Sequence, residues 1–309
     1  MTKHELKLLL SHEEMFLFFF KGISEIYANK SKHYQNFLPK IDFEERFQQI
    51  PTRLYKYIDL DGGITSINNR TIRFSDPLSF WGHETLGDKT EFWFDRIYID
   101  HISLQQMYVI ISAKSPRHRC FDEKDVFLYL LHHQILNLTK RNKVLCLAKT
   151  FENQELWNDY SQGICIEYNT DLFIKNRPIF PNSETFSLIG RPILYVDNLV
   201  KYPIRTTDDF WLSNLIFVKN KNPFIREDEY RILYTDEDYD SVKEIPRRKD
   251  RLEQVIKLLL NGEVRETPPL DAHIDTKYIV KVYYKNSVKD EKRLLNTLQK
   301  FNIPVEKLD

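Results

Sequence analysis

The sequence predicts an α+β fold with mixed, mainly antiparallel sheets, flanking helices and a helical N-terminal extension. Short β-prone runs recur along the chain, at residues 53–58, 70–75, 144–148, 163–168 and 277–284. Runs with helical spacing of apolar residues alternate with them, at residues 124–138, 247–261 and 291–301. No repeat, low-complexity tract or linker interrupts the main body, so we expect a single α+β domain over residues 49–309.

The N-terminal part has a different pattern. Between residues 2 and 38, leucines and phenylalanines such as Leu6, Leu9, Leu10 and Phe18 recur at helical spacing, and Pro39 ends the pattern. We therefore expect residues 1–48 to form a helical extension that packs on the main domain or on a partner chain.

The first half of the main body predicts two strands joined by a turn. Asp61-Gly62-Gly63 is a turn signal between the strands at 53–58 and 70–75, and residues 79–84 form a polar-aromatic loop. The segment 98–112 is apolar but ambiguous between helix and strand.

The second half begins with a strand–helix–strand unit, in which residues 151–161 form the short helix. Residues 175–191 contain two prolines and read as a loop. Further elements follow: a strand at 192–196, a helix at 210–218, a strand within 222–234 and a short C-terminal strand.

Composition excludes some function classes. Lys+Arg and Asp+Glu both number 45, so no global charge draws the protein onto nucleic acid or an anionic membrane. The eight glycines include neither a Walker nor a Rossmann pattern. The three cysteines are isolated, which is typical of a reducing, cytoplasmic compartment. The most apolar run of the N-terminus, at residues 15–20, is too short for a membrane span. No His, Asp or Glu cluster has the spacing of a metal site.

The strongest candidate site lies in residues 222–234. On a strand, Glu227, Glu229 and Arg231 would fall on one face, with the two carboxylates roughly 7 Å apart. Buried carboxylates are costly unless they are paired or used, and Arg231 would be the partner that keeps one ionised. The alternative is an edge strand with a solvated charged face.

Three upstream segments could converge on the same place. Tyr55 and Lys56, with Arg53, could hold a flat ring and a phosphate, or form an ordinary strand. Ser75 ends a strand at a loop mouth, where it could contact a ligand or cap a turn. Tyr160, three residues after Trp157, could belong to a stacking wall or to the core.

Four segments together resemble an uncharacterised bacterial family of domains of unknown function that is often found near phage-defence genes. The first two are Leu54-Tyr-Lys-Tyr57 and Ile72-Arg-Phe-Ser-Asp-Pro-Leu-Ser-Phe80. The third joins Leu145-Cys-Leu147 to Leu156-Trp-Asn-Asp-Tyr160 and Gly163-Ile-Cys-Ile-Glu-Tyr168, and the fourth is Arg226-Glu-Asp-Glu-Tyr-Arg231. The resemblance covers roughly residues 53–235. The order of strands and the late Glu-x-Glu are in turn similar to ADP-ribosyltransferases.

That similarity implies roles for the candidate residues, with NAD as the substrate. Arg53 or Lys56 would hold the phosphates and Ser75 the nicotinamide ribose. The ring that stacks on the nicotinamide would be Tyr55, Phe80 or Tyr160. Glu229 would stabilise the oxocarbenium-like ribose, and Glu227 would orient the acceptor or a water.

The sequence thus favours an NAD-consuming enzyme, either an ADP-ribosyltransferase with a protein or nucleic-acid acceptor or an NAD hydrolase, acting as a toxic effector in phage defence. Two alternatives stay open. One is a non-enzymatic sensor or protein-interaction module, and the other is a nuclease.

Overall fold

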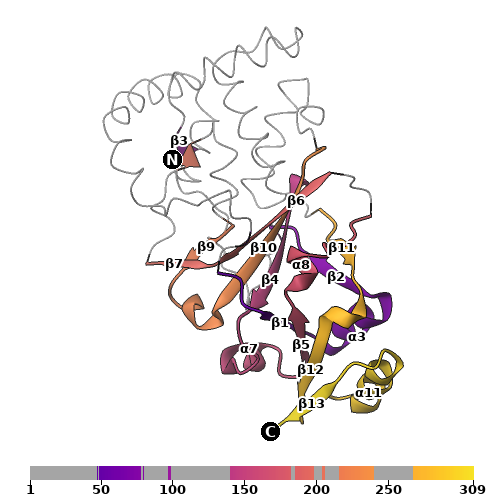
Figure 1. The fold of residues 1–309 in the computed structure, drawn as a ribbon. Helices are drawn as coiled ribbons and strands as arrows, with labels where there is room; N and C mark the ends of the chain where they lie inside the picture. The colour runs from indigo at the N-terminus through magenta and orange to yellow at the C-terminus, as the bar shows by residue number, and fades with distance from the viewer. Residues whose placement is uncertain are drawn as a thin grey trace, which may run out of the picture.

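The structure is a computed structural model that describes residues 47, 49–77, 79, 97–98, 140–181, 185–197, 204–205, 216–239 and 267–309. Its centre is a seven-stranded sheet with the strand order β13-β12-β5-β1-β4-β10-β6, and Figure 1 shows these strands with their flanking helices. Neighbouring strands are antiparallel except β12 and β13, which are parallel. The α+β class is confirmed.

The strands of this sheet are β1 (Arg53–Ile58), β4 (Asn142–Ala148), β5 (Ile164–Asn169), β6 (Phe186–Pro192), β10 (Glu229–Asp236), β12 (Ile279–Lys285) and β13 (Val305–Leu308). The described helices are α3 (Leu60–Asn69), α7 (Gln154–Asp159), α8 (Asp171–Ile174) and α11 (Glu291–Lys300), with 3₁₀ turns η4 (Phe224–Glu227) and η6 (Thr276–Tyr278). Three short pairs complete the described elements: β2 (Thr71–Phe74) with β11 (Leu270–His273), β7 (Leu194–Val196) with β9 (Val218–Asn220), and β3 (Ile97–Tyr98) with β8 (Ile204–Arg205).

The two faces of the sheet pack differently because side chains alternate along each strand. One face buries Leu54, Ile166 and Tyr230 against α3, β2 and α11 in the main core. The other face carries an aromatic cluster in which Tyr57 packs edge-on against Trp157 at 5.2 Å between ring centroids. Polar groups that belong to the candidate site lie on this second face.

The sheet is split between β1 and β4. These strands are paired only at Tyr55 and Ala148, although β1 pairs with β5 along its whole length. Further along, Ser75 takes the place of β1 and exchanges two backbone hydrogen bonds with Val144, of 2.8 and 2.9 Å. Within the split, the Lys56 ammonium donates to the Cys146 carbonyl at 3.0 Å. In the middle of the sheet, the Lys56 side chain therefore bridges β1 and β4 where backbone hydrogen bonds would otherwise join the two strands.

The turn predicted at Gly62-Gly63 is wrong, because both glycines lie inside α3. Asp59 caps this helix by accepting a hydrogen bond from the Gly62 N–H at 2.7 Å. A Cβ at Gly63 would lie 2.5 Å from Ile164 Cδ1, so the glycine allows α3 to lie close against β5. The glycines serve close packing here and not chain reversal.

The loop predicted over residues 175–191 is also partly wrong, because β6 begins at Phe186. Pro178 and Pro181 lie ahead of that strand, so they leave its N–H groups intact for pairing with β10. The helix predicted over residues 210–218 is also wrong at its last residue, because Val218 begins strand β9.

Several predictions lie outside the described residues. They are nearly all of the N-terminal extension, the loop residues 80–84, most of the segment 98–112, and the helices predicted at 124–138 and 247–261. The remaining strands and helices of the main body are confirmed within a few residues at each end.

Candidate functional site

A cavity of about 640 Å³ opens at the split between β1 and β4. It is lined by residues of β1, α3, β2, β4, α7 and β10, and so draws on both faces of the sheet. Six of the eight candidate residues line it: Tyr55, Lys56, Ser75, Tyr160, Glu227 and Glu229. The cavity therefore brings together candidate residues from segments that are distant in sequence.

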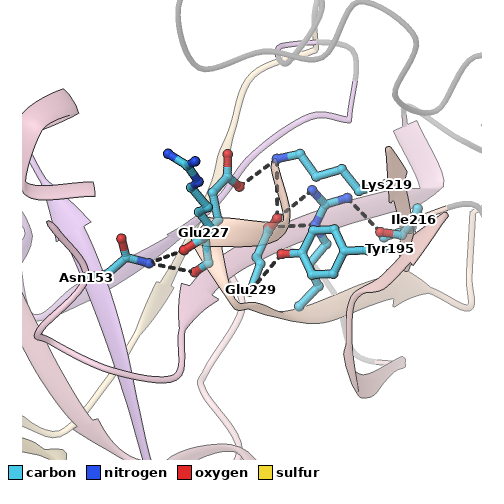
Figure 2. A network of polar contacts seen from close by, with 8 residues as sticks. Asn153, Tyr195, Ile216, Lys219, Glu227 and Glu229 are labelled. Carbon is cyan, nitrogen blue, oxygen red and sulfur yellow. Dashed lines mark hydrogen bonds and ion pairs between the residues drawn. The ribbon is translucent and has the colours of Figure 1, made fainter. Parts of the chain in front are cut away.

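Glu229 and Arg231 form a buried ion pair on one face of β10 (Figure 2). Arg231 donates through Nε to Glu229 Oε1 at 2.7 Å and through Nη2 to Oε2 at 2.9 Å. Its Nη1 donates to the Ile216 carbonyl at 2.7 Å. Burial alone would raise the pKa of Glu229, but the charges of Arg231 and Lys219 outweigh it and hold the pKa at about 2. The predicted role of Arg231, keeping a carboxylate ionised, is confirmed.

Glu227 does not lie on the strand, contrary to the sequence interpretation. It ends the 3₁₀ turn η4, and Asp228 then adopts a left-handed conformation with φ of 44° before β10 begins at Glu229. The alternation that was expected to place Glu227 beside Glu229 begins only after this turn. Both carboxylates nevertheless line the cavity, because the turn folds back beside the strand.

Lys219 of β9 links the two carboxylates and was missed by sequence reasoning. Its Nζ lies 2.7 Å from Glu227 Oε2 and 3.6 Å from Glu229 Oε2, and its side chain is only 4% exposed. The ring of Phe224 lies 4.4 Å from the same ammonium. The sequence offered no signal for this position, because Lys219 directly followed a predicted helix.

The two carboxylates consequently differ in protonation. Burial is the largest influence on Glu227 and raises its pKa to about 7, with Lys219 opposing the shift and the negative charge of Glu229 adding to it. Among the described residues, Glu227 Oε1 has no hydrogen-bond partner, whereas both oxygens of Glu229 are held by Arg231. Glu227 can therefore exchange a proton near neutral pH, and Glu229 stays anionic.

Lys56 is the cation that faces the cavity from β1. Its ammonium donates one hydrogen bond, to the Cys146 carbonyl, and no carboxylate in the described part of the chain lies within ion-pair distance of it. Burial lowers the pKa of Lys56, and the nearby charge of Glu229 partly opposes this. An ammonium with two unused donors in a cavity is suited to an anionic group of a ligand.

Arg53, the other cation that the sequence offered, does not line the cavity. Its Nε lies 3.1 Å from Glu167 Oε1, and the Tyr283 hydroxyl donates to Glu167 Oε2 at 2.7 Å. Arg53 therefore neutralises a buried carboxylate on the aromatic face. Of the two cations predicted to hold phosphates, only Lys56 is placed to do so.

Some of the predicted aromatic and hydroxyl residues line the cavity and others do not. Tyr55 and Tyr160 line the cavity, and burial raises the pKa of Tyr160 to about 12, so its hydroxyl remains a donor at neutral pH. Trp157 is buried in the core, as its helical spacing suggested, and donates through Nε1 to the Phe151 carbonyl at 2.7 Å. Ser75 lines the cavity while its backbone bridges β4. Phe80 lies outside the described residues.

Two further residues position the carboxylates. The Tyr195 hydroxyl accepts a hydrogen bond from the Glu229 N–H at 3.0 Å. Asn153 donates through Nδ2 to the carbonyls of Arg226 and Glu227, at 2.6 and 3.2 Å. An asparagine ahead of a helix is a recognisable capping signal, but the bonds to a distant turn are visible only in the structure.

Comparison with protein-family models, with curated proteins and with solved structures gives no match, so the geometry of the site carries the functional argument. Within the described residues, no helix has the length and apolar character needed to cross a membrane. The same residues contain no group of three or more His, Cys, Asp or Glu side chains arranged to hold a metal ion.

Proposed function

We propose that this protein is an NAD-consuming enzyme that transfers ADP-ribose to an acceptor or to water. The observation that carries the proposal is the convergence of Lys56, Ser75, Tyr160, Glu227 and Glu229 on one cavity of about 640 Å³. Cavities of roughly 300–1,000 Å³ are the usual size for small-molecule and cofactor sites.

The chemistry that the carboxylates can support is cleavage of a glycosidic bond. The bond between nicotinamide and ribose breaks with its electron pair going to the positively charged pyridinium, so nicotinamide leaves as a neutral molecule and needs no acid. Positive charge develops on the ribose, where nearby carboxylates stabilise it. An acceptor oxygen then bonds to the ribose carbon and releases a proton, which needs a base.

Glu227 fits the base better than Glu229 does. Its pKa of about 7 matches the range in which a general base works best, and one of its oxygens has no partner among the described residues. The charge of Glu229 is matched by Arg231, so its part is to supply a fixed negative charge and to raise the pKa of Glu227. This refines the roles implied by the resemblance, in which Glu229 acts directly on the ribose.

The cationic and aromatic groups suit the rest of NAD. The Lys56 ammonium can pair with a phosphate, and Tyr55 or Tyr160 can stack on a flat ring. Lys56 forms no ion pair with a described carboxylate, and its one hydrogen bond goes to the Cys146 carbonyl, so its ammonium has donors left for a phosphate.

The test is release of nicotinamide from NAD by purified protein, with and without cell extract as a source of acceptors. We expect release by the wild type and loss of release in Glu227→Gln. Glu306→Gln is the matched control, because Glu306 pairs with Lys281 at 2.9 Å and does not line the cavity. Absence of release by the wild type under both conditions would overturn the proposal.

A further inference from the structure

Asn153 lies between the two parts of the chain that bring Glu227 and Tyr160 to the cavity. It directly precedes α7, and its Oδ1 accepts hydrogen bonds from the Glu155 and Leu156 N–H groups at 3.1 and 3.2 Å. Its Nδ2 points the other way and donates to the carbonyls of Arg226 and Glu227 in η4. One carboxamide thus binds the start of α7 and the end of η4 together.

The orientation of Asn153 is itself set by β1. The Asn153 N–H donates to the Tyr57 hydroxyl oxygen at 3.2 Å, and that hydroxyl donates to the Thr150 carbonyl at 3.1 Å. Asn153 is 9% exposed, so water competes little for these bonds. Arg226 with Glu155 and Lys149 with Asp228 form solvent-accessible ion pairs that salt screens, and the Lys149 N–H also donates to the Asp228 carbonyl at 3.2 Å.

We propose that Asn153 is a positioning residue for the site, which holds the turn carrying Glu227 against helix α7, whose residue Leu156 and C-cap Tyr160 also line the cavity. The catalytic consequence rests on the proposed function, but the clamp itself does not. Asn153 touches neither the cavity nor any reacting atom, and it acts only through the backbone of η4 and α7.

Both halves of the carboxamide are needed for this role. Serine and aspartate cap helices as well as asparagine does, because each offers an acceptor oxygen. Only the amide adds two N–H donors, which are the groups that reach η4. Replacing Asn153 by serine therefore keeps the helix cap and removes the clamp, so the two functions can be separated.

The experiment compares the wild type with Asn153→Ser by two independent readouts. The first is the pKa of Glu227, measured by carboxyl-carbon NMR and assigned with Glu227→Gln. The second is kcat and KM for nicotinamide release. The matched control is Asp290→Ser, an N-cap exchange at α11, where Asp290 accepts from the Arg293 N–H at 3.1 Å and does not line the cavity.

If the clamp operates, Asn153→Ser stays folded but lets Glu227 swing into water, so its pKa falls from about 7 toward its ordinary value near 4.3. Turnover then falls by up to about 100-fold in kcat with a smaller change in KM, the cost of misplacing a reacting group by about 1 Å. Asp290→Ser leaves both readouts at their wild-type values.

A folded Asn153→Ser protein with an unchanged Glu227 pKa would overturn the clamp. Should the serine variant not fold, Asn153→Asp takes its place, since it keeps the shape and the cap and turns the donor group into an acceptor. Wild-type values in that variant would overturn the clamp equally. A lowered Glu227 pKa in a protein whose wild type does not release nicotinamide would support the clamp and overturn only the proposed function.

Discussion

Arg231 donates hydrogen bonds to both carboxylate oxygens of Glu229, at 2.7 and 2.9 Å. The two residues lie two positions apart on the same strand, and both side chains are buried. The pair leaves Glu229 anionic and without a free oxygen, while Glu227 keeps an oxygen that faces no described partner. Under the proposed function, the role of the base therefore falls to Glu227 in the turn and not to Glu229 on the strand.

Because of this pairing, Glu229→Gln is expected to damage the fold as well as any activity. Removing one partner of a buried ion pair costs about 3–5 kcal/mol, and here Arg231 would lose the carboxylate that accepts two of its hydrogen bonds. The double variant Glu229→Met with Arg231→Met should cost less than Glu229→Gln alone, because no charge then remains buried without its partner. Urea unfolding measures all three proteins, and equal or larger destabilisation of the double variant would contradict the expected coupling.

Stability should fall as pH rises through the range in which Glu227 ionises. Its folded pKa of about 7 is above the unfolded value near 4.3, so the folded state binds the proton more tightly between these limits. The stabilisation from the protonated form is complete below about pH 4.3 and is lost as pH approaches and passes 7. Glu227→Gln cannot ionise, so its stability relative to the wild type should rise by up to about 3 kcal/mol between pH 5 and 8.

The same titration measured on Glu306→Gln serves as the control, because Glu306 is an exposed partner of Lys281. A constant stability difference between wild type and Glu227→Gln across this range would mean that Glu227 has an ordinary pKa in the folded protein.

Lys56 and Arg53 should behave in opposite ways when each is replaced by methionine. Lys56→Met removes a half-buried cation with no carboxylate partner in the described chain, so stability should change little, while KM for NAD rises about 10–100-fold. Arg53→Met leaves the buried Glu167 without its cation and should destabilise the protein, with KM unchanged. A raised KM in Arg53→Met and not in Lys56→Met would reassign the phosphate contact.

Gly163 should tolerate no side chain. A Cβ there would lie 2.3 Å from the Ile58 backbone oxygen, which cannot move without disturbing β1. We expect Gly163→Ala to destabilise the protein by about 1–3 kcal/mol, the usual cost of overpacking. Gly62→Ala is the comparison, because its Cβ would meet the Asp59 side chain at 2.9 Å and that side chain can shift. Equal thermal stability of the two variants would contradict this account.

Much of the fold could be predicted from the local pattern of residue types. Strands such as β1, β5 and β12 were predictable because β-branched and aromatic residues alternate or run between turn signals, and α11 because Leu294 and Leu298 recur at helical spacing. The predictions were wrong where glycine or proline has a different physical role from the one that its local pattern suggested. The glycines of α3 permit close packing, and the prolines before β6 do not touch its hydrogen-bond ladder.

The site was predictable only in part, for a related reason. Glu227 and Glu229 were identified from their spacing, but the left-handed Asp228 between them removes Glu227 from the strand. Lys219 reaches the Glu227 carboxylate, and Asn153 the Glu227 backbone carbonyl, through tertiary contacts that no local pattern encodes. Arg53 and Lys56 are three residues apart on β1, so their side chains lie on opposite faces of the sheet, where Arg53 pairs with Glu167 and Lys56 lines the cavity.

The pH dependence of nicotinamide release tests the central claim most directly. If Glu227 is the base, kcat/KM for the wild type should rise with pH and level off with a midpoint near 7, since only the ionised carboxylate can accept a proton. Glu227→Gln should show no such rise at its residual rate. A wild-type profile that is flat between pH 5 and 9, or one that Glu227→Gln reproduces, would contradict the assignment.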